Sequence, residues 1–212
     1  MSETYFIKSY CHIKNQTVSV NGVELFNDNA EDFSSFIKDA YKHLNTAYPK
    51  FFKMDNLSKL GFLAADLLLR EESLSEESAS GNRLENNIAL VFSNSASSLD
   101  TDRKHQSLIQ NSEAYFPSPA VFVYTLPNIG MGEISIRHKL FSENSFFIFD
   151  RFNAAHLQLY ASHLLKTEKA EKVLCGWVEF DKDTYHAFLY LVEKEGEIEH
   201  KTEEINRLFN TL

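Results

Sequence analysis

The sequence has 212 residues, of which 43% are hydrophobic and 24% are charged, and its formal net charge is −9. With only four prolines and seven glycines, this composition predicts one globular domain spanning residues 1–212 and excludes a linker-rich or disordered chain. The acidic balance also argues against non-specific binding to nucleic acid or to an anionic membrane, so we expect neither as a partner.

The two cysteines, Cys11 and Cys175, both fall in strand-like segments. They lack the CxxC spacing of a metal or redox pair, so we expect buried free thiols in a reducing compartment. The first ten residues show no basic segment followed by an apolar run, and no stretch approaches the ~20 apolar residues of a membrane span. We therefore expect a cytoplasmic protein without a signal peptide.

The amino-terminal part of the sequence predicts two strands. Residues 5–12 and 17–25 alternate polar and apolar side chains, as half-buried strands do. The second segment contains Asn21-Gly22, a dipeptide typical of tight hairpin turns. We expect one strand followed by a strand or a short hairpin.

Two helices follow, at residues 30–44 and 59–69, each with apolar side chains recurring at spacings of three and four. Asn29 is the expected N-cap of the first, with Asp32 favourably placed near the positive end of the helix dipole. Residues 70–83 are rich in Glu and Ser, which favours a surface loop or a short exposed helix.

The rest of the sequence alternates strands and helices, which places the chain in the α/β class. The predicted strands are residues 87–92, 145–149, 172–180 and 184–193. The predicted helices are residues 102–110, 126–138, 152–165 and the amphipathic tail 195–212. Gly130 and Gly132 are expected on a closely packed helix face. The 152–165 helix is apolar around most of its circumference, as expected of a helix buried between layers.

Several segments resemble, in order, the amino-terminal half of a β-ketoacyl synthase. They are KMDNLSKLG at residues 53–61, IALVF followed by SNS at 88–95, SPAVFVYTLPN at 118–128, GEISIRH at 132–138 and KVLCGWVE at 172–179. Together they cover about residues 45–195. The match resembles most the divergent ketosynthase-like proteins of bacterial aryl-polyene and flexirubin pathways. The resemblance implies a thiolase-like fold with a mixed, mostly buried five-stranded sheet and helices on both faces.

The resemblance also implies where a nucleophile should stand. Ketosynthases place a cysteine in a tight turn that enters a buried helix, where the helix dipole favours the thiolate. Alignment of that helix on Ala161 puts the position at Arg151, or with a shift of one at Asp150 or Phe152. Asp150 could in principle attack an acyl group, but the motif places no histidine base for it. We expect no catalytic residue here.

The family's second half supplies two histidines and a lysine for decarboxylative condensation. The sequence ends at Leu212, soon after the strand that closes the first half, so we expect this half to be missing. A lone half would expose an apolar face of the 152–165 helix, at a cost of ~25 cal/mol per Å². We expect a dimer, or the tail 195–212 folded over that face.

Three groups of residues are candidates for ligand binding. The small residues of the 93–98 segment, in particular Ser93, Asn94 and Ser95, could let backbone N–H groups approach a phosphate or pantetheine, or could form a plain surface loop. The resemblance implies that Thr125, Pro127 and Asn128 line an acyl channel, although core and turn geometry also explains them. Arg151 could bind a carrier phosphate or a carboxylate, or pair with Asp150 or Glu179.

Other motifs carry weaker signals. Asp100-Thr101-Asp102 could bind a cation or cap a helix. His156 and His163 lie seven residues apart, but no further ligand accompanies them, so we expect no metal and no other cofactor. No G-x-S-x-G elbow of a serine hydrolase is present.

These observations favour a non-catalytic, ketosynthase-like partner of chain-length-factor type in fatty-acid-like or polyene biosynthesis. It would form a heterodimer with a full-length ketosynthase, shape acyl binding without condensing, and meet an acyl carrier protein. An enzyme that binds acyl thioesters with altered chemistry is the alternative, and a homodimeric scaffold without an acyl ligand is a third.

Overall fold

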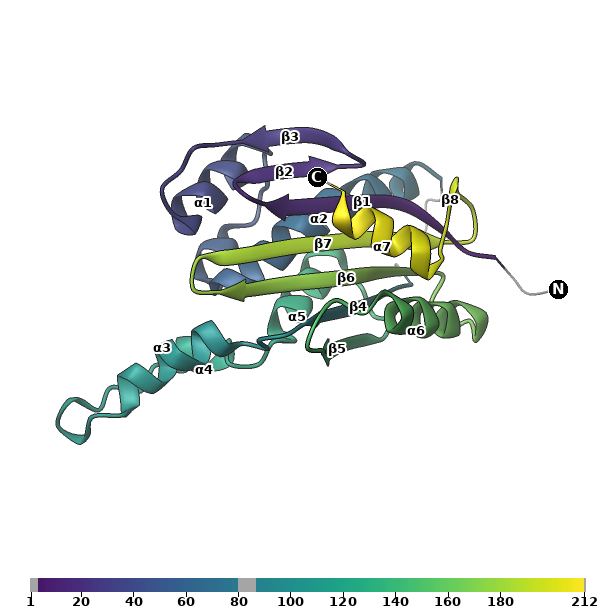
Figure 1. Ribbon diagram of the computed structural model, residues 1–212. Helices are drawn as coiled ribbons and strands as arrows, with labels where there is room; N and C mark the ends of the chain where they lie inside the picture. The colour runs from purple at the N-terminus through teal and green to yellow at the C-terminus, as the bar shows by residue number, and fades with distance from the viewer. Residues whose placement is uncertain (1–3, 80–86, 212) are drawn as a thin grey trace.

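The computed structural model describes residues 4–79 and 87–211, which form an eight-stranded mixed sheet with helices on both faces (Figure 1). The strands are β1 (Phe6–Lys14), β2 (Thr17–Val20), β3 (Val23–Asn27), β4 (Ile88–Asn94), β5 (Asn144–Ile148), β6 (Lys172–Asp181), β7 (Thr184–Glu193) and β8 (Ile198–Glu199). The helices are α1 (Phe33–His43), α2 (Asn56–Ala79), α3 (Leu99–Ile109), α4 (Pro119–Val123), α5 (Ile129–His138), α6 (Ala154–Lys166) and α7 (Thr202–Asn210), with 3₁₀ turns at Pro49–Lys53 and Ser112–Ala114.

The strand order is β3-β2-β1-β7-β6-β4-β5, and β8 pairs with β1. β4 runs parallel to both β5 and β6, whereas the other pairs are antiparallel. The mixed sheet is confirmed, but five strands is wrong. The sheet has three strands more than the resemblance implied, and the β2–β3 hairpin and the short β8 account for this difference.

Tight turns explain why the first segment folds as a meander. Asn15 and Gln16 have φ of 49° and 58°, and Asn21 and Gly22 have φ of 51° and 78°. Positive φ at both central residues is the geometry of the type I′ hairpin turn, whose twist matches that of the flanking strands. The Asn21 side chain also accepts the Tyr10 backbone N–H at 2.9 Å. The turn predicted at Asn21-Gly22 is confirmed, and it divides residues 17–25 into two strands.

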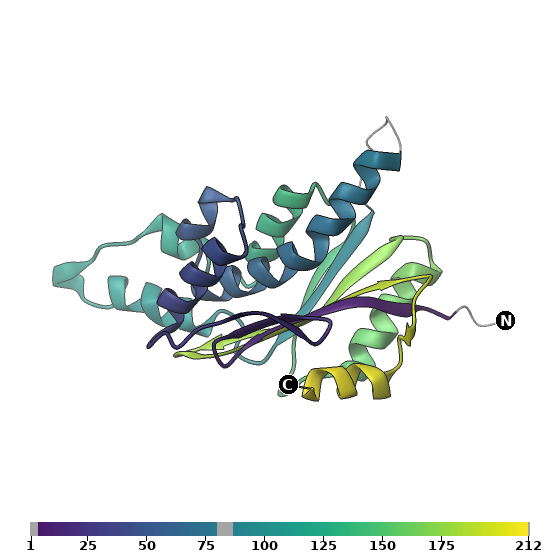
Figure 2. The ribbon, with the colours of Figure 1, turned by 90° about the horizontal axis from the view of Figure 1, so that it is seen from above.

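The sheet separates two hydrophobic layers (Figure 2). Helices α1, α2 and α5 cover one face, and α6 and α7 cover the other. Every residue of β4 is buried, as its continuous apolar run predicts. Helices α3 and α4 belong to an arm, residues 99–126, that projects beyond the end of the sheet (Figure 1).

The starts of α1 and α2 are set by aspartate caps. Asp32 is the N-cap of α1 and accepts the Ser35 N–H at 2.9 Å, so the prediction of Asn29 as cap is wrong. The Asp55 carboxylate likewise accepts the Ser58 N–H at 2.9 Å. Each carboxylate satisfies a free N–H at the positive end of a helix. α2 continues to Ala79 rather than ending at residue 69, and residues 80–83 of the predicted loop lie outside the described residues.

A glycine lets α5 approach α2 closely. A Cβ at Gly130 would lie 3.0 Å from Oγ of Ser58, so the prediction of a closely packed face is confirmed there. Nothing lies within 4 Å of a Cβ at Gly132, so the prediction for that glycine is wrong.

Asp66 links the same two helices through a buried polar cluster. Its carboxylate accepts from Arg70 at 2.7 Å, His138 at 3.2 Å and Arg137 at 3.4 Å. Burial alone would raise the pKa of Asp66, but the hydrogen bond from His138 and the charge of Arg70 lower it to about 2. The cluster therefore holds a negative charge that only its cationic neighbours make acceptable in the interior.

Two glycine substitutions test how the sheet is packed. Gly176 in β6 has a φ of +153°, and a Cβ there would lie 1.9 Å from the Phe188 carbonyl oxygen of β7. We expect Gly176→Ala to destabilise the fold by more than about 4 kcal/mol. Gly132→Ala, the matched control, should stabilise it by about 0.5–1 kcal/mol through helix propensity. Urea unfolding of both variants measures this, and a Gly176→Ala protein of wild-type stability would contradict the packing described.

Candidate functional site

The turn between β5 and α6 holds the position at which the resemblance places a nucleophile. Asn153 caps α6 by accepting the His156 N–H at 3.0 Å. Asp150 and Arg151 are exposed just before it, and Phe152 is partly buried. Residues 149–155 contain no serine, threonine or cysteine. The turn therefore offers no hydroxyl or thiol side chain at the position that the resemblance indicates.

Phe152 fills the space in front of this turn with an aromatic contact. Its ring stacks on Phe209 of α7, with centroids 3.9 Å apart and planes 9° apart. Phe188 and Trp177 meet the Phe152 ring edge-on, at 5.8 and 6.1 Å. The amino terminus of α6 is therefore tied to the carboxyl-terminal helix by a stack of rings rather than left open above the sheet.

Helix α7 folds back over the α6 layer. This agrees with the second of the two expectations above, that the tail 195–212 folds over the helix rather than leaving its face to a dimer. The side-chain oxygen Oε1 of Gln158 accepts hydrogen bonds from the Thr202 backbone N–H at 3.0 Å and from the Thr202 hydroxyl at 2.6 Å. Ile205 and Leu208 are buried in the same core as α6. The amphipathic helix predicted for the tail is confirmed, although Leu159 of α6 stays 72% exposed.

An open depression of about 410 Å³ lies beside this contact. It is lined by residues 149–155 together with Thr202 and Asn206 of α7. Arg151 lies here, apart from the other predicted ligand residues. The depression is polar and shallow, so it could admit a charged group but encloses nothing.

The loop after β4 is closed on itself rather than open to an anion. The Glu179 carboxylate accepts the Ser95 N–H and hydroxyl, both at 2.7 Å, and the Ala96 N–H at 3.3 Å. Ser93 donates to the Gly176 carbonyl at 3.0 Å, and the Asn94 side chain bridges the backbone of Ser97. Because a carboxylate of the chain already holds these N–H groups, the plain-loop alternative fits Ser93, Asn94 and Ser95 better than a phosphate cradle.

The loop predicted to bind a phosphate or pantetheine and the segment implied to line an acyl channel do meet each other. The Ser98 hydroxyl donates to the Thr125 carbonyl at 2.6 Å, and the Thr125 hydroxyl donates to the Phe122 carbonyl at 2.7 Å. Asn128 is exposed at the start of α5, and Pro127 lines a small cavity. The structure thus brings the first two predicted groups together and leaves Arg151 in a separate place.

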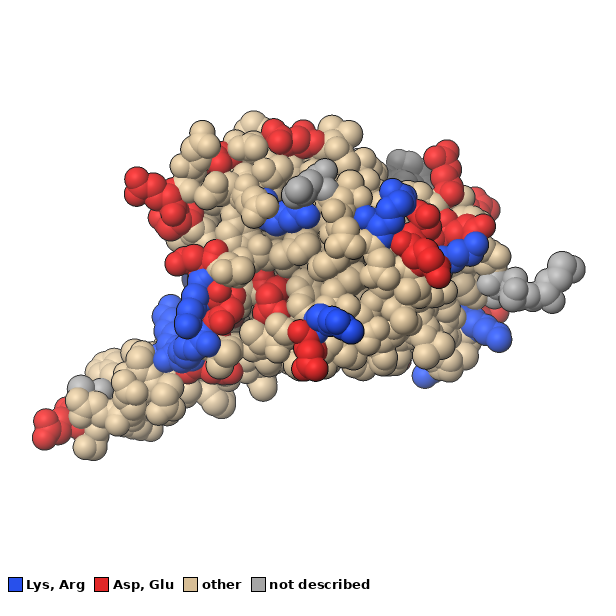
Figure 3. Space-filling model, viewed as in Figure 1, with Lys and Arg blue, Asp and Glu red and all other residues tan. Residues whose placement is uncertain are grey.

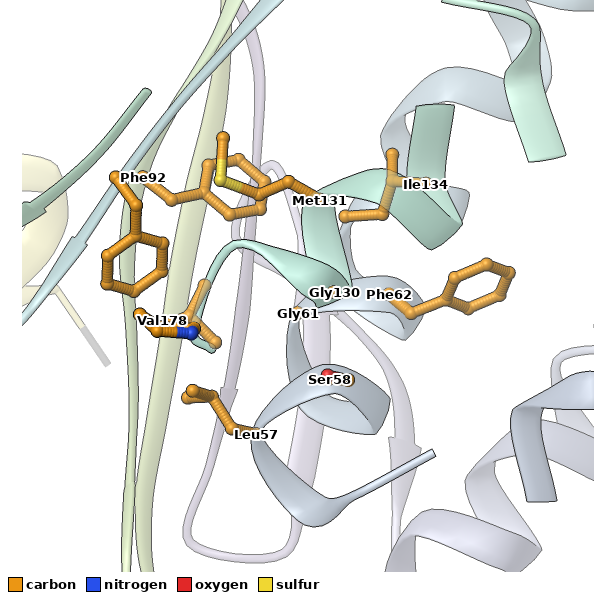
Figure 4. A pocket seen from close by; sticks show the side chains of 11 residues that line it. Leu57, Ser58, Gly61, Phe62, Phe92, Gly130, Met131, Ile134 and Val178 are labelled. Carbon is orange, nitrogen blue, oxygen red and sulfur yellow. The ribbon is translucent and has the colours of Figure 1, made fainter. Parts of the chain in front are cut away.

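The cavity lined by Pro127 is about 10 Å³, room for about one water molecule (Figure 4). Phe92 and Val178 of the sheet close one side, and Met131 and Ile134 of α5 fill the other. A cavity of this size holds no acyl chain. The acyl channel that the resemblance implies at Thr125, Pro127 and Asn128 stays a prediction.

Neither cysteine is placed to act as a nucleophile. Cys11 and Cys175 are fully buried free thiols in β1 and β6, as predicted. Burial raises the pKa of both thiols well above their usual value, so neither forms a thiolate at neutral pH.

A histidine pair that sequence reasoning missed lies under α7. His12 Nε2 is 3.0 Å from the Leu208 carbonyl, and His12 Nδ1 is 3.3 Å from His186 Nε2. Since a carbonyl only accepts, His12 donates from Nε2 and accepts from His186. Burial lowers the pKa of His12 to about 4 and that of His186 to about 3, with Lys14 adding to both shifts. At neutral pH both histidines are therefore uncharged, and His12 holds α7 through its hydrogen bond to the Leu208 carbonyl. We call His12 and His186 the histidine latch.

Comparison with known proteins was made on sequence and on structure. No protein-family model and no curated protein matches the chain. Among solved structures, the ishigamide ketosynthase/chain length factor matches at 17% identity and a TM-score of 0.62, over 90% of this chain and 62% of that one.

Two further structures match similarly. A ketosynthase in complex with its chain length factor from Xenorhabdus doucetiae matches at 16% identity and a TM-score of 0.56, over 91% of this chain and 79% of that one. A type II polyketide synthase acyl-carrier protein in complex with its ketosynthase matches at 14% identity and a TM-score of 0.59, over 91% and 63%. The chain has a ketosynthase-like fold.

Sequence identity this low shows the fold alone. The present chain also spans less than two thirds of the length of the first and the third of these structures. Within the described residues, no helix is long and apolar enough to cross a membrane.

His156, considered above as a metal ligand, packs instead among Phe147, Phe149 and Tyr160.

Acidification tests the histidine latch. The unfolded chain binds protons at His12 and His186 from about pH 6.5 downward, whereas the folded chain binds them only near the lowered pKa values of about 4 and 3. The stability they contribute is therefore complete above pH 6.5 and is lost as the pH falls through 4. We expect the free energy of unfolding to fall by a few kcal/mol over this range, on the order given by these shifts.

Urea unfolding between pH 4 and 7.5 measures the slope. His12→Gln keeps a donor for the Leu208 carbonyl but does not titrate, so it should flatten the slope. His163→Gln, at an exposed position on α6, is the control and should leave the slope unchanged. A stability that does not vary across the range would contradict the latch.

Proposed function

We propose that this chain is a non-catalytic, ketosynthase-like subunit of chain-length-factor type, which pairs with a full-length ketosynthase in fatty-acid-like or polyene biosynthesis. The observation that carries the proposal is the start of α6. It has the helix and the turn of a nucleophile site but presents Arg151, Phe152 and Asn153. The ring of Phe152 in this turn stacks on Phe209 of α7, with centroids 3.9 Å apart.

The comparisons support this class of partner. Two of the matching structures are described as a ketosynthase with a chain length factor, and a third as a ketosynthase with its acyl-carrier protein. These descriptions belong to those proteins. For this chain they support a role beside a competent ketosynthase, which would supply the cysteine and the histidines that decarboxylative condensation needs.

The proposed subunit would influence the length of the acyl product without taking part in the condensation reaction. Its own cavity between α2, α5 and the sheet is about 10 Å³, so a growing acyl chain would lie in the partner or along the surface shared by the two. The carrier protein would reach the pair through the ketosynthase.

Figure 3 shows one face of the molecule, on which Lys and Arg side chains at the base of the arm lie next to acidic ones. Arg103 of α3 is one of the paired cations, because it forms an ion pair with Asp181.

The alternative, an enzyme with altered chemistry, rests on the open depression that holds Asp150 and Arg151. Arg151 could orient an anionic group while the Asp150 carboxylate attacks a thioester carbonyl. The attack would form an acyl anhydride and release the thiolate, and water would then hydrolyse the anhydride. No histidine lines this depression.

Acyl transfer from a radiolabelled acyl-carrier protein separates the two functions. We expect no covalent label on this chain, because the α6 turn has no cysteine or serine, and full labelling of the ketosynthase in the same mixture. The measurement is autoradiography after denaturing electrophoresis.

Thioester hydrolysis by the isolated chain is the companion assay, because an anhydride intermediate could turn over too quickly to trap. We expect the wild-type chain and Asp150→Ala to match the uncatalysed rate. Hydrolysis by the wild type that Asp150→Ala reduces about 100-fold or more would establish the alternative and overturn the non-catalytic role.

A further inference from the structure

Helix α7 lies as a thin cover across β1 and β7, on the face of the sheet that also carries α6 (Figure 1 and Figure 2). Two of its residues, Ile205 and Leu208, are buried, and Phe209 stacks on Phe152. A helix of nine residues is not stable in water by itself, so α7 stays helical through its contacts with the sheet and α6. Loss of these contacts would unfold α7 without unfolding the sheet.

The last turn of this helix rests on the histidine latch. His12 Nε2 is 3.0 Å from the Leu208 carbonyl, and the His186 ring lies 4.9 Å from the Phe209 ring, measured between centroids. His12 is buried and His186 is partly buried. Both imidazoles are therefore covered by the end of α7.

A third histidine stands at the start of the same helix. His200 precedes α7, is 5% exposed, and lies against the Tyr190 ring with centroids 5.7 Å apart. Within the described residues, neither nitrogen of the His200 ring has a hydrogen-bond partner. A buried imidazole without a partner gives up hydration that it would regain in water. Both ends of α7 thus cover imidazoles that water would solvate better.

The groups around the three rings are unfavourable to a positive charge. His12 and His186 face each other and the cation Lys14 of β1, while α7 contributes the Leu208 carbonyl and the Phe209 ring. The Tyr10 ring of β1 and the Phe188 ring of β7 complete the surroundings of His12. Next to His200, the charges of Glu199 and Lys201 pair with each other.

These surroundings set the protonation of the closed state. Burial lowers the pKa of His12 to about 4, that of His186 to about 3 and that of His200 to about 4, and Lys14 adds to the first two shifts. In water the same side chains bind protons from about pH 6.5 downward.

We propose that residues 200–210 form a hinged cover, the α7 cover, which opens on acidification while the sheet stays folded. Opening frees the ring of His200 beside the hinge and uncovers His12 and His186. The open state therefore binds up to three protons more than the closed state, and falling pH favours it by linkage. This inference goes beyond the proposed function and does not depend on it.

Opening would also change what surrounds the turn before α6. Thr202 and Asn206 of α7 form one wall of the depression at residues 149–155, and Phe209 covers the ring of Phe152. With the α7 cover open, the wall is gone and Phe152 is exposed on that side. The α7 cover is thus a pH-dependent gate to this turn.

Native-state hydrogen exchange between pH 5 and 6 tests the α7 cover, with mass spectrometry of peptides from α7 and from β4. In this range the histidines are mostly protonated when open and neutral when closed. The opening constant of α7, corrected for intrinsic exchange rates, should rise by up to about tenfold per pH unit for each histidine, or up to about 1,000-fold for all three. The amides of β4, buried throughout, should stay protected for longer, because they exchange through global unfolding.

Single substitutions count the protons. His200→Leu removes an imidazole that has no hydrogen-bond partner within the described residues, and His200→Phe is a second variant at the same position. His12→Gln keeps a donor for the Leu208 carbonyl. Each should make the rise per pH unit up to about tenfold smaller. His163→Gln, at an exposed position on α6, is the control and should leave the rise unchanged.

Protection of the β4 amides shows that each variant is folded, and only folded variants are compared. An opening constant of the wild-type α7 that does not change with pH would overturn the proposal. So would an α7 that opens only together with β4, because the unit that opens would then be the whole fold. A rise that stays at the wild-type value in the folded histidine variants would overturn it as well.

Discussion

The stack between Phe152 and Phe209 joins the turn before α6 to helix α7, and the rest of the account depends on this contact. It fixes α7 to the turn that starts α6, and it does so over the part of the sheet formed by β6 and β7, where Phe188 and Trp177 complete the cluster. A helix laid on one face of a sheet must cover its apolar stripe or leave it in water. Here the chain provides that cover from its own carboxyl-terminal helix.

The same contact lies beside the turn at which the resemblance places a nucleophile. A helix amino terminus can stabilise a thiolate and an oxyanion, but only if a nucleophile and a substrate reach it. In this chain residues 149–155 include no cysteine, serine or threonine, and Phe152 stacks on Phe209 of α7. The Glu179 carboxylate holds the N–H groups of the loop after β4. The cavity between α2, α5 and the sheet is about 10 Å³, too small for an acyl chain.

Much of the fold could be predicted from the sequence, because its signals are local. Asn21-Gly22 specifies a type I′ turn, and the apolar run that became β4 specifies a strand covered on both faces. The joint order of short motifs indicated the ketosynthase-like fold. The strand count failed because the family resemblance says nothing about strands added at the edge of the sheet. The cap of α1 failed because Asn29 and Asp32 are both good caps, and only packing decides between them.

The site was less predictable, because its contacts join residues that are far apart in the sequence. No periodicity links Glu179 to Ser95 or Phe152 to Phe209; these pairings follow from where β6 and α7 lie. The histidine latch left no signal either, since His12 and His186 read as ordinary members of two strands until β1 and β7 pair.

The most direct test of the account is reconstitution of the ketosynthase with its carrier protein, with and without this chain, followed by mass spectrometry of the carrier-bound products. The account predicts that the chain alone makes no product, and that adding it to the ketosynthase narrows or shifts the distribution of acyl lengths. An unchanged distribution, or condensation by the chain without the ketosynthase, would contradict it.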